Sequence, residues 1–217
     1  MELLVITRRT FVAGASAIAI LAALDVATSP ALWAQDATPA GLMTPPGLGD
    51  RVLGKDDAPV TVIEYASMTC PHCASFHETT YPELKKRYID TGKVRFIFRE
   101  FPLDTLAAAA SMLARCADQE KFFPLIETLF QRQRQWAVQQ AIPPLLAIAK
   151  QAGFTEEKFN ACLSDQKILD ALEAERNRAS EQFGVNSTPS IFVNGKLHRG
   201  GISIEEIAKL IDPLIKS

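Results

Sequence analysis

Residues 67–76 read Ser-Met-Thr-Cys-Pro-His-Cys-Ala-Ser-Phe, and this stretch decides how the chain folds around it. It follows the apolar run Val-Thr-Val-Ile-Glu-Tyr of residues 60–65, which predicts a strand covered on both faces. Cys70 and Cys73 stand where this strand would feed a helix. The first thiol is therefore expected at a helix N-terminus.

The surroundings of Cys70 favour its ionised form. The first N–H groups of a helix lack backbone partners, and the helix dipole stabilises negative charge beside them. Pro71 suits the first helical position, where a missing N–H costs nothing, and His72 adds a donor or a positive charge beside the sulfur. Helical register turns Cys73 inward while Cys70 stays open to attack, which is the arrangement that disulfide exchange requires.

Zinc binding is the other interpretation of this motif, because zinc sites use the same Cys-X-X-Cys spacing. A second pair of ligands is not evident in the sequence. His77 belongs to the same predicted helix and His198 stands alone, so we expect both to be surface or internally satisfied residues. We favour redox chemistry over structural zinc, and we expect neither a metal nor an organic cofactor.

The composition is that of an ordinary globular chain. The 217 residues, 47% of them hydrophobic, can form one sizeable domain with its own core. A net charge of -2 leaves no basic excess for binding nucleic acid. After residue 34, no segment reaches the ~18 to 20 apolar residues that a membrane span requires.

Residues 1–34 have the features of an export signal. Arg8 and Arg9 precede an apolar stretch of small residues, and residues 31–34, Ala-Leu-Trp-Ala, offer a cleavage site. The arginine pair suits a twin-arginine signal, while a general secretory signal and an uncleaved anchor remain open. Residues 35–50, rich in Pro, Gly, Ala and Thr, predict a flexible leader. We therefore expect the mature protein in the periplasm.

The rest of the chain alternates between strand and helix patterns. Short strands are predicted at residues 51–54 and 94–101, and Pro82 should kink the helix that begins at Cys70. Asn194-Gly195 predicts a type I′ hairpin turn, and a capping box at residues 203–206 predicts a final helix. The pattern between residues 103 and 183 is helical throughout, with candidates at 106–117, 121–134, 143–152, 155–163 and 167–183.

This order of elements resembles the DsbA-like thiol:disulfide oxidoreductases. The resemblance rests on Cys70-Pro71-His72-Cys73 after a strand and on Thr188-Pro189 just before the hairpin, and it extends from about Gly54. It implies an α/β thioredoxin fold over residues 51–217 with an all-helical insertion at about 103–166.

The resemblance also implies roles for individual residues. Cys70 would be the nucleophile and Cys73 the resolving thiol, with His72 stabilising the thiolate of Cys70. Pro189 would be a cis-proline beside the active site. Thr188 would pair its backbone with an extended substrate peptide.

Three further residues complete the predicted site and its support. Glu64 matches the family's buried acid, which would accept or relay the proton of Cys73 through water; an ion pair with Arg99 is the alternative. Cys116 and Cys162 fall on two predicted helices of the insertion. In an oxidising compartment we favour a structural disulfide between them over two buried free thiols.

The function that we expect is the oxidation of cysteine pairs in unfolded, newly exported proteins. A DsbB-like membrane protein would reoxidise the Cys70–Cys73 pair, and the enzyme would act as a monomer. A disulfide isomerase or reductase is the first alternative. A holdase that binds unfolded exported chains without catalysis is the second.

Overall fold

The structure, a computed structural model, describes residues 38–215. The predicted export signal of residues 1–34 lies outside the described residues, as do residues 35–37 of the predicted leader. Within residues 38–215, no helix combines the length and the apolar character needed to cross a membrane.

In this part of the chain, five strands form one sheet in the order β1-β3-β2-β4-β5. The two long central strands, β2 and β3, run parallel, and the other neighbouring pairs are antiparallel. Their apolar side chains are buried on both faces, as expected for central strands covered on both sides. The strands are β1 Arg51–Leu53, β2 Val60–Ala66, β3 Val94–Glu100, β4 Ser190–Val193 and β5 Lys196–Arg199.

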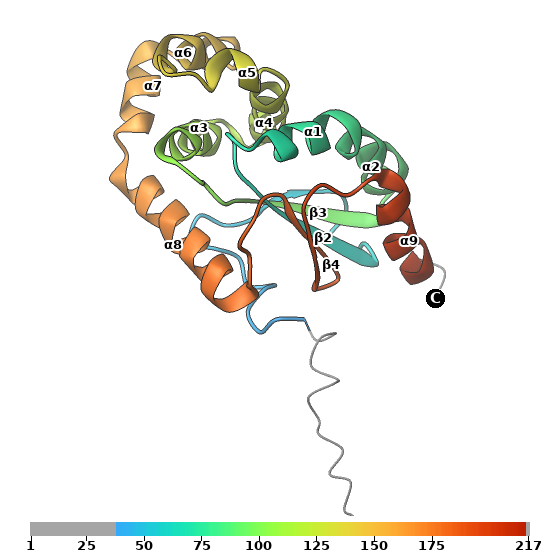
Figure 1. Cartoon of the computed structure of the whole chain (residues 1–217). Coiled ribbons are helices and arrows are strands. Elements are labelled where there is room, and N and C mark those ends of the chain that lie inside the picture. The colour runs from blue at the N-terminus through green and yellow to red at the C-terminus, as the bar shows by residue number, and fades with distance from the viewer. Residues whose placement is uncertain (1–37, 216–217) are drawn as a thin grey trace, which may run out of the picture. The chain divides into compact units, whose positions relative to one another are not determined.

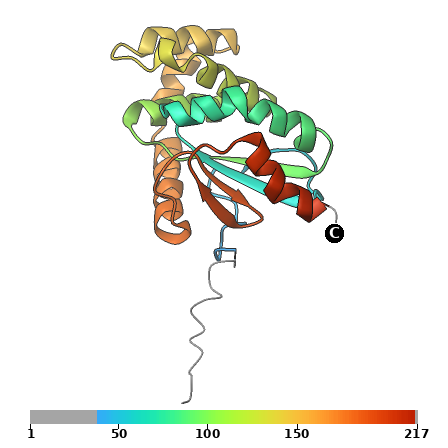
Figure 2. The same cartoon turned by 45° about the vertical axis from the view of Figure 1, so that its right-hand side comes forward.

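Helices cover both faces of the sheet (Figures 1 and 2). Val62 and Phe96 face α1 (Pro71–Thr79), α2 (Tyr81–Leu84) and α9 (Ile204–Ile215), whose apolar residues join them in one core cluster. Their neighbours Ile63 and Ile97 face the other way, toward the end of α8 (Gln166–Phe183). This alternation between two cores follows from the two-residue period of a strand.

The predicted insertion is a block of helices between β3 and β4 that shares the core of the sheet. Phe122 and Ile126 of α4 lie in the same cluster as Phe96 and Phe98 of β3. The helix predicted over residues 121–134 is divided, because α4 ends at Gln131 and a short helix follows. The block comprises α3 Thr105–Cys116, the 3-10 turn η3 Gln119–Lys121, α4 Phe122–Gln131, α5 Gln133–Trp136, α6 Ile142–Gln151, α7 Glu156–Leu163 and α8.

Pro82 interrupts the helix that begins after Cys70. α1 ends at Thr79 and α2 begins at Tyr81, followed by the π-helical turn η2, Lys85–Ile89. Proline has no N–H to donate to the carbonyl four residues earlier, so the predicted kink becomes a break.

Two local predictions near the C-terminus are confirmed. Asn194 and Gly195 both adopt positive φ, 43° and 87°, in the turn between β4 and β5. Ser203 N donates to Glu206 Oε2 at 2.9 Å and Glu206 N donates back to Ser203 Oγ at 3.3 Å, which completes the capping box of α9.

Residues 38–50 belong to the predicted leader of residues 35–50; they are irregular and pack on the domain. Leu42 is fully buried in the core on the α8 side of the sheet. The buried Arg99 donates to the carbonyl of Leu42 and to the carboxylate of Asp50, each at 2.8 Å. Arg115 donates to the carbonyl of Gly49 at 2.9 Å. These hydrogen bonds hold the segment against the domain despite its content of Pro and Gly.

Candidate active site

Cys70 occupies the cap position immediately before α1. β2 ends at Ala66, the chain turns through three residues, and Cys70 has extended backbone angles, φ -75° and ψ 119°. Pro71 takes the first helical position, as predicted. The following N–H groups, of His72 and Cys73, form hydrogen bonds with the Cys70 sulfur. The strand and the helix thus place this sulfur on a helix N-terminus.

Hydrogen bonds lower the pKa of the Cys70 thiol from 9.0 to about 5. The largest cause is the bond from the Cys73 side chain, and burial acts in the opposite direction. Contact with Thr188 and the N–H groups of Cys73 and His72 add to the lowering. His72 therefore acts through its backbone. Its side chain is exposed, and the effect of the imidazole on the sulfur stays a prediction.

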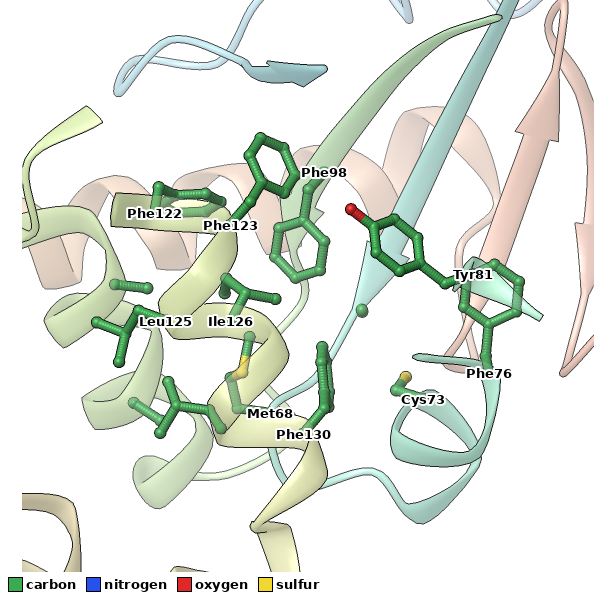
Figure 3. Close-up of a cluster of buried hydrophobic side chains, with 14 of the residues drawn as sticks. Met68, Cys73, Phe76, Tyr81, Phe98, Phe122, Phe123, Leu125, Ile126 and Phe130 are labelled. Carbon is green, nitrogen blue, oxygen red and sulfur yellow. The ribbon is translucent and has the colours of Figure 1, made fainter. Parts of the chain in front are cut away.

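Cys73 is buried more completely than Cys70, which is 6% exposed, and its pKa is shifted in the opposite direction. Its side chain is fully buried beside Phe76 and Phe130 (Figure 3). Burial raises its pKa well above 9.0, and its hydrogen bond to Cys70 and the negative charge of Glu64 act in the same direction. Both sulfurs are free thiols in this structure. The two members of the motif therefore differ strongly in acidity, with the outer one ionised at neutral pH.

The loop before β4 lies against Cys70. The Thr188–Pro189 peptide bond is cis. The Cys70 sulfur lies 3.2 Å from the carbonyl oxygen of Thr188 and donates to it when protonated, although the two residues are 118 positions apart in sequence. The fold thus brings together the two motifs on which the family resemblance rests. Backbone pairing of Thr188 with a substrate peptide stays a prediction.

Glu64 lies beneath the motif, but its partner is His77 and not Arg99. The Nε2 atom of His77 is 2.9 Å from Oε2 of Glu64, and their side chains are 2% and 0% exposed. The ion-pair alternative is wrong because Arg99 binds Asp50 and Tyr65 on the other face of the sheet. Sequence reasoning missed this role of His77, although its position one helical turn after the inward Cys73 was a usable signal.

Gln133 of α5 and Asp104, the N-cap residue of α3, hold the loop that carries Cys70, and no local feature of the sequence indicates either contact. The buried amide of Gln133 on α5 donates to the carbonyls of Met68, at 2.8 Å, and of Cys70, at 3.0 Å. Thr69 donates to the carboxylate of Asp104 at 2.7 Å. The insertion therefore fixes the conformation of the active-site loop.

Comparisons with known proteins agree with this geometry. Residues 48–213 match the family model described as Thioredoxin. Disulfide bond formation protein D of Bacillus subtilis is 31% identical over 174 residues, which cover 77% of this chain and 78% of that protein. The crystal structure of alpha-DsbA1 from Wolbachia pipientis superposes with a TM-score of 0.73 at 34% identity, covering 77% of this chain and 91% of that one. This chain belongs to the DsbA-like thioredoxin family.

A protein of Rickettsia bellii, provisionally named a protein-disulfide oxidoreductase, is 40% identical to this DsbA-like chain over 169 residues. The match covers 77% of this chain and 65% of that relative, so the chain spans slightly less than two thirds of its length. The comparisons confirm the predicted family and the predicted thioredoxin fold with a helical insertion.

A disulfide joins Cys116 of α3 to Cys162 of α7 in the DsbA-like helical block, with the Cα atoms 6.2 Å apart. It closes a sequence separation of 46 residues and ties the two helices together. Of the two states that the sequence allowed, the structure has the bonded one. Over residues 38–215, no three His, Cys, Asp or Glu side chains are arranged to hold a metal ion.

Proposed function

We propose that this chain is an exported protein-disulfide oxidase of the DsbA type. The observation that carries the proposal is the difference in acidity between the two thiols, with the pKa of Cys70 lowered to about 5 and that of Cys73 raised. Stabilising the Cys70 thiolate stabilises the dithiol form of the enzyme. The disulfide form then takes electrons readily from substrate thiols.

The reaction proceeds by two thiol–disulfide exchanges. A substrate thiolate attacks the Cys70 sulfur, forms a mixed disulfide and expels Cys73, which takes up a proton. A second substrate thiolate attacks the substrate sulfur of the mixed disulfide and expels Cys70 as a thiolate. The substrate leaves with one disulfide and the enzyme keeps two electrons. A leaving thiol of low pKa departs faster, which suits Cys70 to the second step.

The substrates and partners follow from this chemistry and from the family. We propose unfolded exported proteins with free cysteines as substrates and a DsbB-like membrane protein as the reoxidant. Thr188 would pair with the substrate backbone beside cis-Pro189, and Glu64 would exchange the proton of Cys73. The export signal of residues 1–34 would direct the chain to the periplasm.

The test is oxidative refolding of a reduced, disulfide-containing substrate protein by a stoichiometric amount of the oxidised chain. We expect native disulfides to form with the wild-type protein and no activity with Cys70→Ser. Cys73→Ser cannot form the Cys70–Cys73 disulfide and should also be inactive in this assay. Incubated instead with a protein that carries a disulfide, its Cys70 thiolate should attack that disulfide, expel one protein thiolate and accumulate as a mixed disulfide, because the resolving thiol is missing. The Cys116→Ala/Cys162→Ala variant is the matched control and should retain exchange activity.

The same assay separates the alternatives. Rapid reduction of insulin disulfides without net oxidation would favour a reductase, and faster repair of scrambled disulfides than of reduced thiols would favour an isomerase. A holdase would be favoured if the wild type exchanged no disulfides and the Cys70→Ala variant suppressed aggregation of an unfolded protein as well as the wild type does. Any of these results would overturn the oxidase proposal.

A further inference from the structure

Glu64 and His77 form a buried polar pair among aromatic side chains. Both side chains are at most 2% exposed, and Nε2 of His77 lies 2.9 Å from the carboxylate. Burying such a pair carries a desolvation cost that a hydrophobic pair of similar volume would avoid. Packing alone therefore does not account for these two residues.

The pair lies directly next to the inward thiol. Cys73 and His77 are one turn apart on α1, so their side chains leave the same face of the helix. Glu64 projects from β2 toward this face and is close enough for its charge to raise the pKa of Cys73. Thiol, carboxylate and imidazole thus form one buried group behind Cys70.

Aromatic rings fix the orientation of the imidazole. The His77 ring stacks on Phe130, with centroids 4.3 Å apart and planes at 23°, and lies 4.6 Å from the ring of Tyr81. Phe98 packs against it edge-on from β3. Packed in this way, the ring keeps Nε2 aimed at the carboxylate.

Each partner also keeps one atom open to a proton or a water molecule. Oε1 of Glu64 and Nδ1 of His77 are buried and lack a hydrogen-bond partner within the described residues. A buried polar atom left in this state calls for an explanation, and proton exchange supplies one.

Tyr81 and Glu100 are ionisable groups on elements that pack around the pair. Tyr81 of α2 stays protonated because burial, followed by the charge of Glu127 on α4, raises its pKa far above neutrality. Glu100 of β3 is bound by Arg115 through two bonds of 2.6 Å. Cys73 is the thiol on which the charge of the pair acts.

We propose that His77 is a positioning residue that makes Glu64 and His77 a single proton-exchange unit for Cys73. This inference rests on the disulfide exchange proposed above. His77 would hold the carboxylate in place, and its imidazole would share the proton that moves between the pair and Cys73.

Reduction of the enzyme disulfide leaves Cys73 as a thiolate that needs one proton. The electron pair of the attacking substrate thiolate forms the bond to Cys70, and the pair of the Cys70–Cys73 bond leaves on Cys73. That thiolate takes one proton from the Glu64–His77 unit, which regains a proton from water. During reoxidation the Cys73 thiol returns a proton to the unit as its sulfur attacks the mixed disulfide.

The test compares His77→Gln, Glu64→Gln and the double variant with the wild type, using His198→Gln as the matched control. Single-turnover reduction of the oxidised protein by a dithiol peptide is followed between pH 5 and pH 9. General acid–base assistance is worth about 100-fold or more, so we expect each single variant to slow the step by at least about tenfold near neutral pH. Because the two residues act as one unit, the double variant should be no slower than the worse single variant.

The control and the thiolate signal separate this role from a structural one. His198→Gln should match the wild type, and the ultraviolet absorbance of the Cys70 thiolate should titrate unchanged in all variants. A His77→Gln variant with the wild-type rate and pH profile would overturn the proposal, as would losses that multiply in the double variant. A wild type that exchanges no disulfides would instead overturn the proposed function.

A second measurement uses the wild type and does not depend on the folding of a variant. The imidazole NMR signals of His77 should shift when the disulfide is reduced, and they should shift again over the pH range in which Cys73 titrates. The signals of His198 should follow neither change. His77 signals that are unaffected by the redox state would overturn the proposal.

Discussion

The stability of the reduced protein should depend on pH through Cys70. Its pKa falls from 9.0 in an unperturbed thiol to about 5 in the folded chain, so the folded state binds fewer protons than the unfolded state between these values. A group of lowered pKa stabilises the fold at high pH and loses this effect as pH falls through the folded pKa. For these two pKa values, the ionisation of Cys70 adds about 2.7 kcal/mol to the free energy of unfolding at pH 7 and about 0.4 kcal/mol at pH 5.

The assay is urea unfolding of the reduced wild type and of Cys70→Ser, each at pH 5 and pH 7. We expect the free energy of unfolding of the wild type, relative to Cys70→Ser, to fall by about 2 kcal/mol between pH 7 and pH 5. The oxidised wild type is a second control, because a disulfide sulfur does not titrate. A difference between wild type and variant that stays constant over this range would refute the assigned acidity of Cys70.

Three variants test the supports of the site by urea unfolding. Replacing both Cys116 and Cys162 by Ala opens a loop of 46 residues and should lower the free energy of unfolding by about 4 kcal/mol, without changing the thiolate absorbance of Cys70. Arg99→Met leaves the carboxylate of Asp50 without its buried partner and should cost about 3 to 5 kcal/mol; a cost below about 1 kcal/mol would contradict the assigned network. Gln133→Leu removes two hydrogen bonds to the active-site loop and should cost about 2 kcal/mol, with faster amide hydrogen exchange in residues 67–70 as the specific sign.

The parts of the fold that the sequence predicted well are those encoded by neighbouring residues. Asn194-Gly195 specifies its turn because both positions need positive φ, and Ser203 with Glu206 satisfies the first turn of a helix without help from elsewhere. Cys70 at the strand-to-helix junction belongs to the same class. Such signals reach only a few residues along the chain, which is why they can be read from a single sequence.

The parts that the sequence did not predict depend on contacts between distant segments. Glu64 and His77 can pair only because the fold brings β2 and α1 next to each other. The packing of Leu42 depends on Arg99, which is 57 residues away and donates to its carbonyl. Composition indicated flexibility for residues 38–50 because Pro and Gly report local preference only. Tertiary hydrogen bonds override that preference.

The acidity of Cys70 can be tested through the reduction potential of the Cys70–Cys73 pair, measured against glutathione as a function of pH. Thioredoxin, with a thiol pKa of about 7 and a potential of about -270 mV, is the reference. A pKa of about 5 at Cys70 stabilises the reduced form by about 2.3 kcal/mol more at pH 7, which places the potential near about -220 mV or higher. The potential should fall by about 30 mV per pH unit above pH 5 and about 59 mV per pH unit below it. A value near about -270 mV, with the steeper slope extending to pH 8, would contradict the account.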